Sequence, residues 1–492
     1  MVFKDLVRAI DMGKRDTLRF YLNGHLHQVS PASVTQTVLE YLREHLRLTG
    51  TKEGCAEGDC GACTVTEASL AGNGQVAYSA VNACIRFLPT LDGKAIWTVE
   101  ALSGANGLLH PVQQAMIDHH GSQCGFCTPG FVMSMYTMYQ KGLRAPTREQ
   151  VLEHLSGNLC RCTGYRPIID AAQNMGSYPI AGADHDLVRR QLETLSAQCR
   201  DTLELETPGQ HYIAPTTTFE LAGLLQDNPH AILLAGGTDA GLWVTKQLKK
   251  LDSIIYLGNV AELTHIQRVA GQLKIGAAVL LNDGYEAIAA EYPEATELWK
   301  RFASMPIRNA GTLVGNVANG SPIGDSAPFL IAIGAHVVLR KGGHSRILAL
   351  EDLYLDYRKQ DRAPGEFIEA LLVPLRIPGM QVATYKLSKR FDQDISAVCS
   401  AYALKLENGK VASLRIAHGG MAATARRALH TEQALLGRHW QEAPVRLGMV
   451  AMPQDYQPMT DMRASSAYRL KAAQNLLYRF YLESTGGVRT RV

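Results

Sequence analysis

The pattern of apolar and polar positions near the start of the chain predicts two strands followed by a helix. Residues 17–22 alternate in polarity and end at an Asn-Gly pair, a strong signal for a tight hairpin, so a second strand is expected to reach about residue 29. Apolar residues then recur at helical spacing across residues 33–48, where Ser33 and Gln36 are spaced as a capping box. A glycine-rich segment follows this strand, strand, helix order.

Residues 99–175 carry helical signals only. Pro111 can open a helix, because the missing amide of proline costs nothing at a first helical position. A second helix is expected after Cys127, a third after Thr147, which has a glutamine three residues further on, and a fourth after the turn at residues 160–167. This stretch therefore predicts a helical domain.

Farther along the chain, residues 231–235 form a short apolar run that ends in Gly236-Gly237-Thr238. Two glycines and a hydroxyl residue at a helix start can offer backbone amides to a phosphate, although a glycine turn after a strand is more often only a turn. No G-x-G-x-x-G fingerprint occurs, so a Rossmann nucleotide site is not expected. Residues 302–325 hold another dense run of small and polar residues, which is costly to order unless it wraps a ligand.

Composition bounds the class of protein. At 492 residues the chain is too long for one core, so roughly three or four domains are expected. Its 49 basic and 46 acidic residues nearly balance, which argues against a nucleic-acid partner. No apolar run is long enough to span a membrane, and residues 1–15 lack the features of an export signal. We therefore expect a cytoplasmic location, where clustered cysteines indicate metal binding rather than disulfides.

Eight of the ten cysteines fall into two groups of four whose spacings suit iron–sulfur clusters. The first reads C-x4-C-x2-C with a distant fourth member, the plant-type 2Fe-2S pattern, in a glycine-rich loop that can wrap closely around a cluster. The alternative, a structural zinc site, usually pairs C-x2-C knuckles. The second group is a C-x2-C and a C-x-C at expected helix starts, where the helix dipole favours thiolates. The groups are Cys55, Cys60, Cys63 and Cys84, and Cys124, Cys127, Cys160 and Cys162.

These cysteine motifs closely resemble those of the molybdenum hydroxylases, the family of the xanthine dehydrogenases. The resemblance is carried by residues 55–84, 122–130 and 160–165. It implies that all eight grouped cysteines bind iron in two 2Fe-2S clusters, and it leaves Cys199 and Cys399 as inert thiols.

The resemblance also implies a multidomain α+β fold. Its parts would be a plant-type ferredoxin-like (β-grasp) domain, a four-helix 2Fe-2S domain, an FAD-binding α+β domain of the vanillyl-alcohol-oxidase (PCMH) type, and a C-terminal α/β domain like that of CO dehydrogenase flavoproteins. An Asn-Gly pair at residues 408–409 predicts a hairpin in the last of these. The expected bounds are residues 16–96, 97–178, 209–380 and 381–492, with a linker over residues 179–208.

For FAD, the resemblance implies a pyrophosphate loop, an aromatic contact, a second phosphate loop and three further contacts. Relatives commonly have glycine where this chain has Val314, so the second loop departs from the family pattern there. The implied residues are Leu233, Leu234, Ala235, Gly236, Gly237, Thr238, Asp239 and Ala240; Phe302; Thr312, Gly315 and Asn316; and Asp325, Leu372 and Lys386.

Finally, the resemblance implies that this chain is the small, electron-transfer subunit of a molybdenum hydroxylase. Its arrangement of domains is typical of bacterial xanthine dehydrogenases. Electrons from hypoxanthine or xanthine, oxidised to urate at molybdopterin on a large partner subunit, would cross both clusters to FAD and reduce NAD+. Two small and two large subunits would form a heterotetramer. No general acid or base is expected on this chain. Two alternatives stay open: the same role in an aldehyde or other N-heterocycle hydroxylase, and a non-enzymatic iron–sulfur flavoprotein electron carrier.

Overall fold

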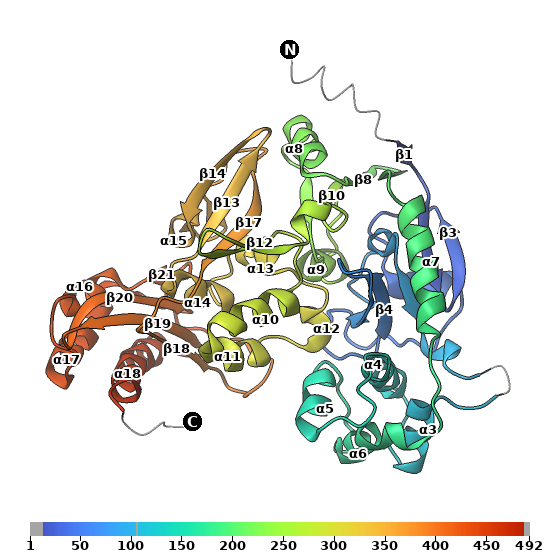
Figure 1. Ribbon diagram of the computed structural model, residues 1–492, viewed down its shortest axis with the longest axis horizontal. Coiled ribbons are helices and arrows are strands. Elements are labelled where there is room, and N and C mark those ends of the chain that lie inside the picture. The colour runs from blue at the N-terminus through green and yellow to red at the C-terminus, as the bar shows by residue number, and fades with distance from the viewer. Residues whose placement is uncertain (1–12, 105–106, 487–492) are drawn as a thin grey trace. The chain divides into compact units, whose positions relative to one another are not determined.

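A computed structural model describes residues 13–104 and 107–486, whose contacts divide the chain into two compact units (Figure 1). The first unit comprises the residues up to 223 together with 230–261 and 304–311. The second comprises 224–229, 262–303 and the residues from 312 onward. The prediction that residues 1–15 lack an export signal concerns a segment that lies mostly outside the described residues.

The first unit contains a five-stranded sheet in the order β3-β2-β6-β4-β5. The alternation predicted for residues 17–22 is confirmed, because Leu18, Phe20 and Leu22 are buried on one face of β2. The chain turns at the Asn-Gly pair and β3 pairs antiparallel with β2, also as predicted. The strands are β2 (Leu18–Leu22), β3 (His25–Val29), β4 (Thr64–Leu70), β5 (Val76–Asn82) and β6 (Ala95–Trp97).

The helix predicted to begin at Ser33 begins later, so that prediction of its start is wrong. Thr37 caps α2 (Val38–Glu40) in a capping box, and a π-helical turn (Tyr41–His45) continues it. The first amide of α2 donates to the carbonyl of Arg86 (2.8 Å). Two capping patterns overlap in the sequence, and this contact with a segment distant in the chain selects the second.

The predicted helices of residues 99–175 are confirmed. α4 lies at the centre of this group, and its methionine and aromatic side chains are buried. α4 also packs on the neighbouring sheet, where the hydroxyls of Thr66 in β4 and Thr137 in α4 lie 2.8 Å apart. The helices are α3 (Pro111–Asp118), α4 (Thr128–Gln140), α5 (Arg148–His154) and α6 (Arg166–Asn174).

A second five-stranded sheet, in the order β1-β7-β8-β10-β9, completes the first unit. The segment predicted as a helical or irregular linker, residues 179–208, contains α7 and β7 of this sheet. The strands are β1 (Lys14–Arg15), β7 (Thr202–Thr207), β8 (Gln210–Ala214), β9 (Ile232–Leu234) and β10 (Ser253–Tyr256). The further helices of this unit are α7 (His185–Gln198), α9 (Thr238–Thr245) and α12 (Met305–Arg308), and the division between the units falls within α8 (Thr218–Asp227).

The second unit is built on two antiparallel sheets, in the orders β11-β12-β17-β13-β14 and β18-β19-β20-β21. The hairpin predicted at residues 408–409 joins β19 to β20. The first sheet and the hairpin beside it comprise β11 (Ile266–Val269), β12 (Gln272–Gly276), β13 (His336–Lys341), β14 (His344–Ala349), β15 (Tyr354–Asp356), β16 (Lys359–Gln360) and β17 (Phe367–Pro374). The second sheet comprises β18 (Met380–Leu387), β19 (Val398–Glu407), β20 (Lys410–Gly419) and β21 (Arg426–Arg427).

The helices of the second unit lie along both sheets (Figure 1). Apolar side chains from α16, α17 and α18 form one core with β18, β19 and β20. The helices are α10 (Leu281–Glu291), α11 (Thr296–Arg301), α13 (Leu313–Asn319), α14 (Ser326–Ala332), α15 (Leu350–Leu353), α16 (Leu429–Leu435), α17 (Glu442–Ala451) and α18 (Ser466–Ser484).

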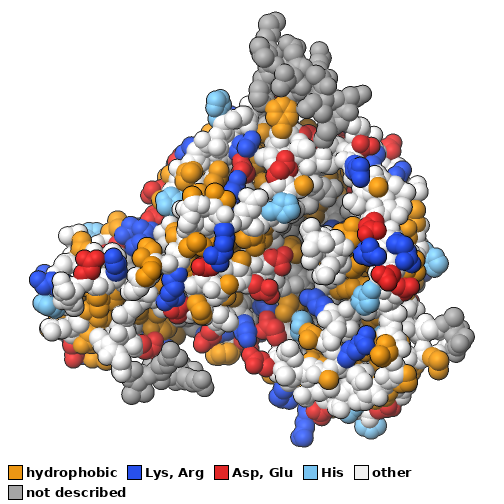
Figure 2. Space-filling model, viewed as in Figure 1, with side chains coloured by type: hydrophobic (Ala, Val, Ile, Leu, Met, Phe, Trp, Pro, Cys, Tyr) orange, Lys and Arg blue, Asp and Glu red, His pale blue; other side chains and the backbone are white. Residues whose placement is uncertain are grey.

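Charged side chains of both signs are intermixed on the face shown in Figure 2. Several of them pair, as Arg346 does with Glu366 at 2.8 Å in the second unit. Across the described ranges, no helix is both long and apolar enough to cross a membrane.

Acid is expected to destabilise the second unit through His418. This imidazole is fully buried in β20, and burial lowers its pKa to about 3. A histidine in the unfolded chain has a pKa near 6.5. As the pH falls from 6.5 toward 3, the unfolded state therefore binds a proton at His418 that the folded state does not bind. The free energy of unfolding should therefore be unaffected by His418 above pH 6.5 and about 2 kcal/mol lower at pH 5.

Urea unfolding of the full chain at pH 7.5 and pH 5 measures this loss. His418→Gln should be less stable at pH 7.5 but should lose part of the pH dependence. His344→Gln, at an exposed position, should keep it. Equal pH dependence in the two variants would contradict the assignment to His418.

Candidate metal and cofactor sites

The four cysteines of the first group converge within the first unit. Three of them lie in the loop before β4, and Cys84 follows β5. The thiol of Cys55 lies within hydrogen-bonding reach of Cys60 and of Cys84, and that of Cys63 lies within reach of Cys84. The fold thus gathers into one place four thiols that the sequence separates, and we call them the first quartet.

Backbone amides surround one sulfur of this quartet. The Sγ atom of Cys55 accepts the amides of Glu57 (3.5 Å), Asp59 (3.4 Å) and Cys60 (3.3 Å). Gly58 makes this wrapping possible, because its φ of 78° is a left-handed conformation that side chains disfavour. Amides directed at sulfur stabilise an anionic thiolate centre, so the quartet and its loop fit a 2Fe-2S cluster.

The other four grouped cysteines form a second quartet among the helices. Cys127 is the N-cap of α4, and Cys160 and Cys162 precede α6. The thiols lie within hydrogen-bonding reach in two pairs, Cys124 with Cys162 and Cys127 with Cys160. The amide of Cys160 is fixed by the hydroxyl of Tyr165 (3.1 Å). Unlike the first quartet, this one has exposed members, Cys124 and Cys162.

Neighbouring thiols shift one another's pKa in opposite directions. Hydrogen bonds, first from Cys60, lower the pKa of Cys55, and the same contact raises the pKa of Cys60. In the second quartet, the backbone amide of Phe126 lowers the pKa of Cys124, while burial raises the pKa of Cys127 to about 12. Because metal ligation requires thiolates, iron loading of either quartet should release protons.

Hydrogen bonds join the loops that carry the two quartets. The amide of Leu159, the residue before Cys160, donates to the carbonyl of Cys60 (3.0 Å). Beside it, Nδ2 of the buried Asn158 donates to the carbonyl of Gly61 (3.1 Å). The hydrogen bond from Leu159 thus links Cys60 of the first quartet directly to the segment that carries Cys160 of the second quartet.

The predicted pyrophosphate loop, residues 233–240, runs from β9 into α9 within the first unit. Gly237 is the N-cap of α9 with φ of 85°, and no side chain caps this helix. A Cβ on Gly236 would lie 2.2 Å from the carbonyl oxygen of Ala310, so only glycine fits this backbone contact. Burial raises the pKa of Asp239. A helix start without a side-chain cap, approached through two glycines, fits the binding of a pyrophosphate.

The second predicted phosphate loop is the first turn of α13 in the second unit. Thr312 caps this helix, since its hydroxyl accepts the amide of Gly315 (3.1 Å) and its carbonyl accepts that of Asn316 (3.0 Å). Val314, the departure from the family pattern, is buried with 2% of its surface exposed. Its side chain therefore belongs to the core.

Asp325 and Lys386 form a buried ion pair, each side chain being only 3% exposed. The other carboxylate oxygen of Asp325 accepts the hydroxyl of Ser396 (2.5 Å). Asp325 precedes α14 and Lys386 lies in β18, so the pair connects two elements of the second unit. This arrangement places two polar groups, both predicted to contact FAD, in one fixed geometry.

Two other predicted flavin contacts, Phe302 and Leu372, are apolar. Phe302 follows α11 and meets the ring of Tyr285 edge-on, with ring centroids 5.9 Å apart. Leu372 lies in β17, is partly exposed and is in register with His336 of β13. These side chains offer apolar surface to a ring system.

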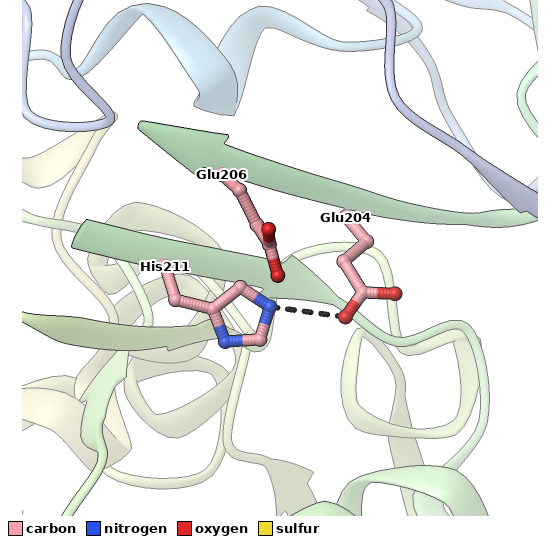
Figure 3. Close-up of side chains that lie close together, drawn as sticks. All are labelled: Glu204, Glu206 and His211. Carbon is pink, nitrogen blue, oxygen red and sulfur yellow. Dashed lines mark hydrogen bonds and ion pairs between the residues drawn. The ribbon is translucent and has the colours of Figure 1, made fainter. Parts of the chain in front are cut away.

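Another group of possible metal ligands lies outside both quartets. Glu204 and Glu206 on β7 and His211 on β8 point toward one another, with ligand atoms within 4.8 Å of each other (Figure 3). The imidazole Nε2 is 3.0 Å from a Glu204 oxygen, and the ammonium of Lys14 is 2.6 Å from the other oxygen. Lys14 already balances part of the negative charge, and we assign this group no metal.

Comparison with known families defines the class of protein. The chain matches a 2Fe-2S iron-sulfur cluster binding domain at residues 20–86, a 2Fe-2S binding domain at 98–173, an FAD binding domain in molybdopterin dehydrogenase at 204–376, and a CO dehydrogenase flavoprotein C-terminal domain at 383–484. The predicted multidomain α+β fold and its cofactors, two 2Fe-2S clusters and FAD, are confirmed. The chain is an iron–sulfur and FAD electron-transfer protein related to the molybdenum hydroxylases.

Similar proteins of known activity include xanthine dehydrogenases. The chain is 31% identical to xanthine dehydrogenase of Emericella nidulans, over 97% of this chain and 39% of that protein. It is also 31% identical to xanthine dehydrogenase 1 of Arabidopsis thaliana, over 85% of this chain and 36% of that protein. The chain thus spans somewhat more than a third of the length of these curated relatives.

A solved structure resembles about half of the chain. It is a chain of the carbon monoxide dehydrogenase from Hydrogenophaga pseudoflava that lacks the Mo-pyranopterin moiety of the molybdenum cofactor. The similarity covers 55% of this chain and 96% of that one, with a TM-score of 0.52 and 28% identity.

Proposed function

We propose that this chain is the iron–sulfur and FAD subunit of a xanthine dehydrogenase. It would pass electrons from molybdopterin on a partner chain through two 2Fe-2S clusters to FAD and on to NAD+. When bound, the clusters carry single electrons and the flavin exchanges one or two. The similarity to xanthine dehydrogenases along most of the chain supports the choice of substrate.

Each cofactor has its own set of residues in this proposal. The first quartet holds one cluster, inside a loop whose amides face sulfur. The second quartet holds the other at the starts of α4 and α6, where helix dipoles favour thiolates. For FAD, Gly236 and Gly237 of the first unit offer amides to a pyrophosphate. Within the second unit, Asp325 with Lys386 offers polar groups that could contact hydroxyl groups.

The hydrogen bond between Leu159 and Cys60 is the observation that carries the proposal. It fixes the two quartets close together within one compact unit. Two metal sites built for structural support alone need no such direct connection. Single electrons exchanged between two clusters do need a short fixed path, and this contact supports one.

The remaining parts of the proposal concern the assembly. The partner is a molybdopterin-containing large subunit, and two copies of each chain form a heterotetramer. NAD+ is the final acceptor, and the location is cytoplasmic. The match to an FAD binding domain of molybdopterin dehydrogenases supports the molybdopterin partner.

The similarity to a chain of carbon monoxide dehydrogenase leaves the substrate open, and a second candidate differs from the first in its substrate. The chain would then serve another molybdenum hydroxylase, one acting on an aldehyde or another N-heterocycle, with the same cofactors. A non-enzymatic electron carrier is less well supported, because a carrier needs no acceptor-reducing flavin.

Two measurements test the proposal. The full chain, purified and reduced with dithionite, should give two distinct rhombic electron paramagnetic resonance spectra. Purified together with its partner, it should form NADH when xanthine is added. A single spectrum from a fully iron-loaded sample would refute the two-cluster assignment. Turnover of an aldehyde but not of xanthine would select the second candidate.

A further inference from the structure

Asn82 lies beside the first quartet and has no role in the proposal above. It is the last residue of β5, in register with Thr64, and it stands two positions before Cys84. Only 2% of its surface is exposed. A buried amide side chain needs hydrogen-bond partners to offset the cost of leaving water.

The partner of this amide is a cysteine sulfur. Nδ2 of Asn82 lies 3.8 Å from Sγ of Cys63 and donates to it. Its Oδ1 is buried without a hydrogen-bond partner. Turning the amide over would leave the nitrogen unpartnered instead and place an oxygen against a thiolate, so the orientation with nitrogen toward sulfur is the favourable one.

The sulfurs of the first quartet therefore accept hydrogen bonds from two different kinds of donor. The exposed loop supplies three backbone amides to Cys55. Near Cys63, the strand-end amides are already used, that of Thr64 by the carbonyl of Gly61 (3.1 Å) and that of Ala83 by the carbonyl of Cys63 (3.2 Å). The backbone amide of Cys84 also lies within hydrogen-bonding reach of the Cys63 sulfur, and the side chain of Asn82 adds a second donor on this buried side.

We propose that Asn82 is a positioning residue that raises the reduction potential of the first cluster by donating a hydrogen bond to the thiolate of Cys63. Reduction adds negative charge to a cluster and its thiolates, and a donor to sulfur stabilises the reduced form more than the oxidised form. The inference rests on the proposed function, in which Cys63 is a ligand of that cluster.

The test is a potentiometric titration of the full chain followed by electron paramagnetic resonance. Asn82→Leu keeps a similar volume but removes the donor. We expect about a tenfold lower ratio of reduced to oxidised first cluster at a fixed solution potential, which for a one-electron couple is a fall of 59 mV. The second cluster should keep its potential. Asn73→Leu, at the exposed turn of the same hairpin and roughly 20 Å or more along the strand, should change neither.

An unchanged potential in Asn82→Leu, with both clusters loaded, would overturn the inference. A variant that loads no first cluster would make Asn82 a structural requirement and would also overturn it, unless the unmodified holoprotein shows the contact directly. For that measurement, side-chain ¹⁵N-labelled asparagine should give a hyperfine coupling to the reduced first cluster in pulsed electron paramagnetic resonance, and its absence would refute the contact. Failure of the proposed function is distinguishable, because the unmodified chain would then show no first-cluster spectrum at all.

Discussion

Replacing Gly61 with alanine is expected to abolish stable loading of both clusters. Gly61 has φ of 70°, a conformation that costs an alanine about 1–2 kcal/mol. The added Cβ would also lie 2.1 Å from the carbonyl oxygen of Gly157 and 2.9 Å from Cα of Asn158. Backbone atoms cannot move aside as a side chain can, so the two loops must separate at a further cost of about 1–3 kcal/mol.

Separation would break the hydrogen bonds that Asn158 and Leu159 make to Gly61 and Cys60. Iron content, visible absorption and urea unfolding of the full chain measure the outcome. Gly74→Ala is a matched control, because Gly74 has φ of 76° but nothing within 4 Å of its Cβ position. If Gly61→Ala loaded iron as well as Gly74→Ala, close packing of the two cysteine loops would not be required.

Lys386→Met is expected to destabilise the second unit by roughly 3–5 kcal/mol, because it leaves the carboxylate of Asp325 buried without its partner charge. Both side chains of this pair are 3% exposed, so solvent cannot replace the lost ammonium. If the pair also contacts FAD as proposed, the variant should elute from a sizing column without flavin while both clusters remain. Flavin absorbance and urea unfolding of the full chain report the two effects separately.

Two companion variants separate charge from packing. Asp325→Asn combined with Lys386→Met removes both charges and should recover part of the stability lost in Lys386→Met alone. Lys389→Met removes an exposed lysine that donates to the carbonyl of Met462 (2.8 Å) and should unfold like the unmodified chain. Equal stability of all three variants would show that the ion pair contributes little to the fold.

Local signals in the sequence predict those elements that local chemistry decides. Thr147, with Gln150, caps α5 as the spacing indicates, and Pro111 opens α3. The start of α2 fails because the sequence offers two capping patterns and only a distant carbonyl, that of Arg86, distinguishes them. Residues 312–316, predicted as a phosphate loop, form the first turn of α13 with Thr312 as its cap, and their contact with FAD stays a prediction.

The candidate sites show the same division. Cysteine spacing predicts both quartets, because each type of cluster constrains the separation of its ligands along the chain. The roles of Asn82 and Asn158 were not predicted from the sequence. No strand or helix signal indicates that an asparagine near the end of that strand or helix will be buried against a cysteine loop. A polar residue two positions before a grouped cysteine occurs in both cases and is the signal that could have found them.

The two quartets differ in exposure, and this difference has a practical consequence for handling the protein. Dissolved oxygen and chelating reagents reach the outward-facing sulfurs of Cys124 and Cys162 directly, whereas Cys63 and Cys84 are shielded inside the fold. Ageing in air should therefore bleach a preparation in two stages, with the helical centre lost first. A brown colour alone would overstate how many molecules remain intact.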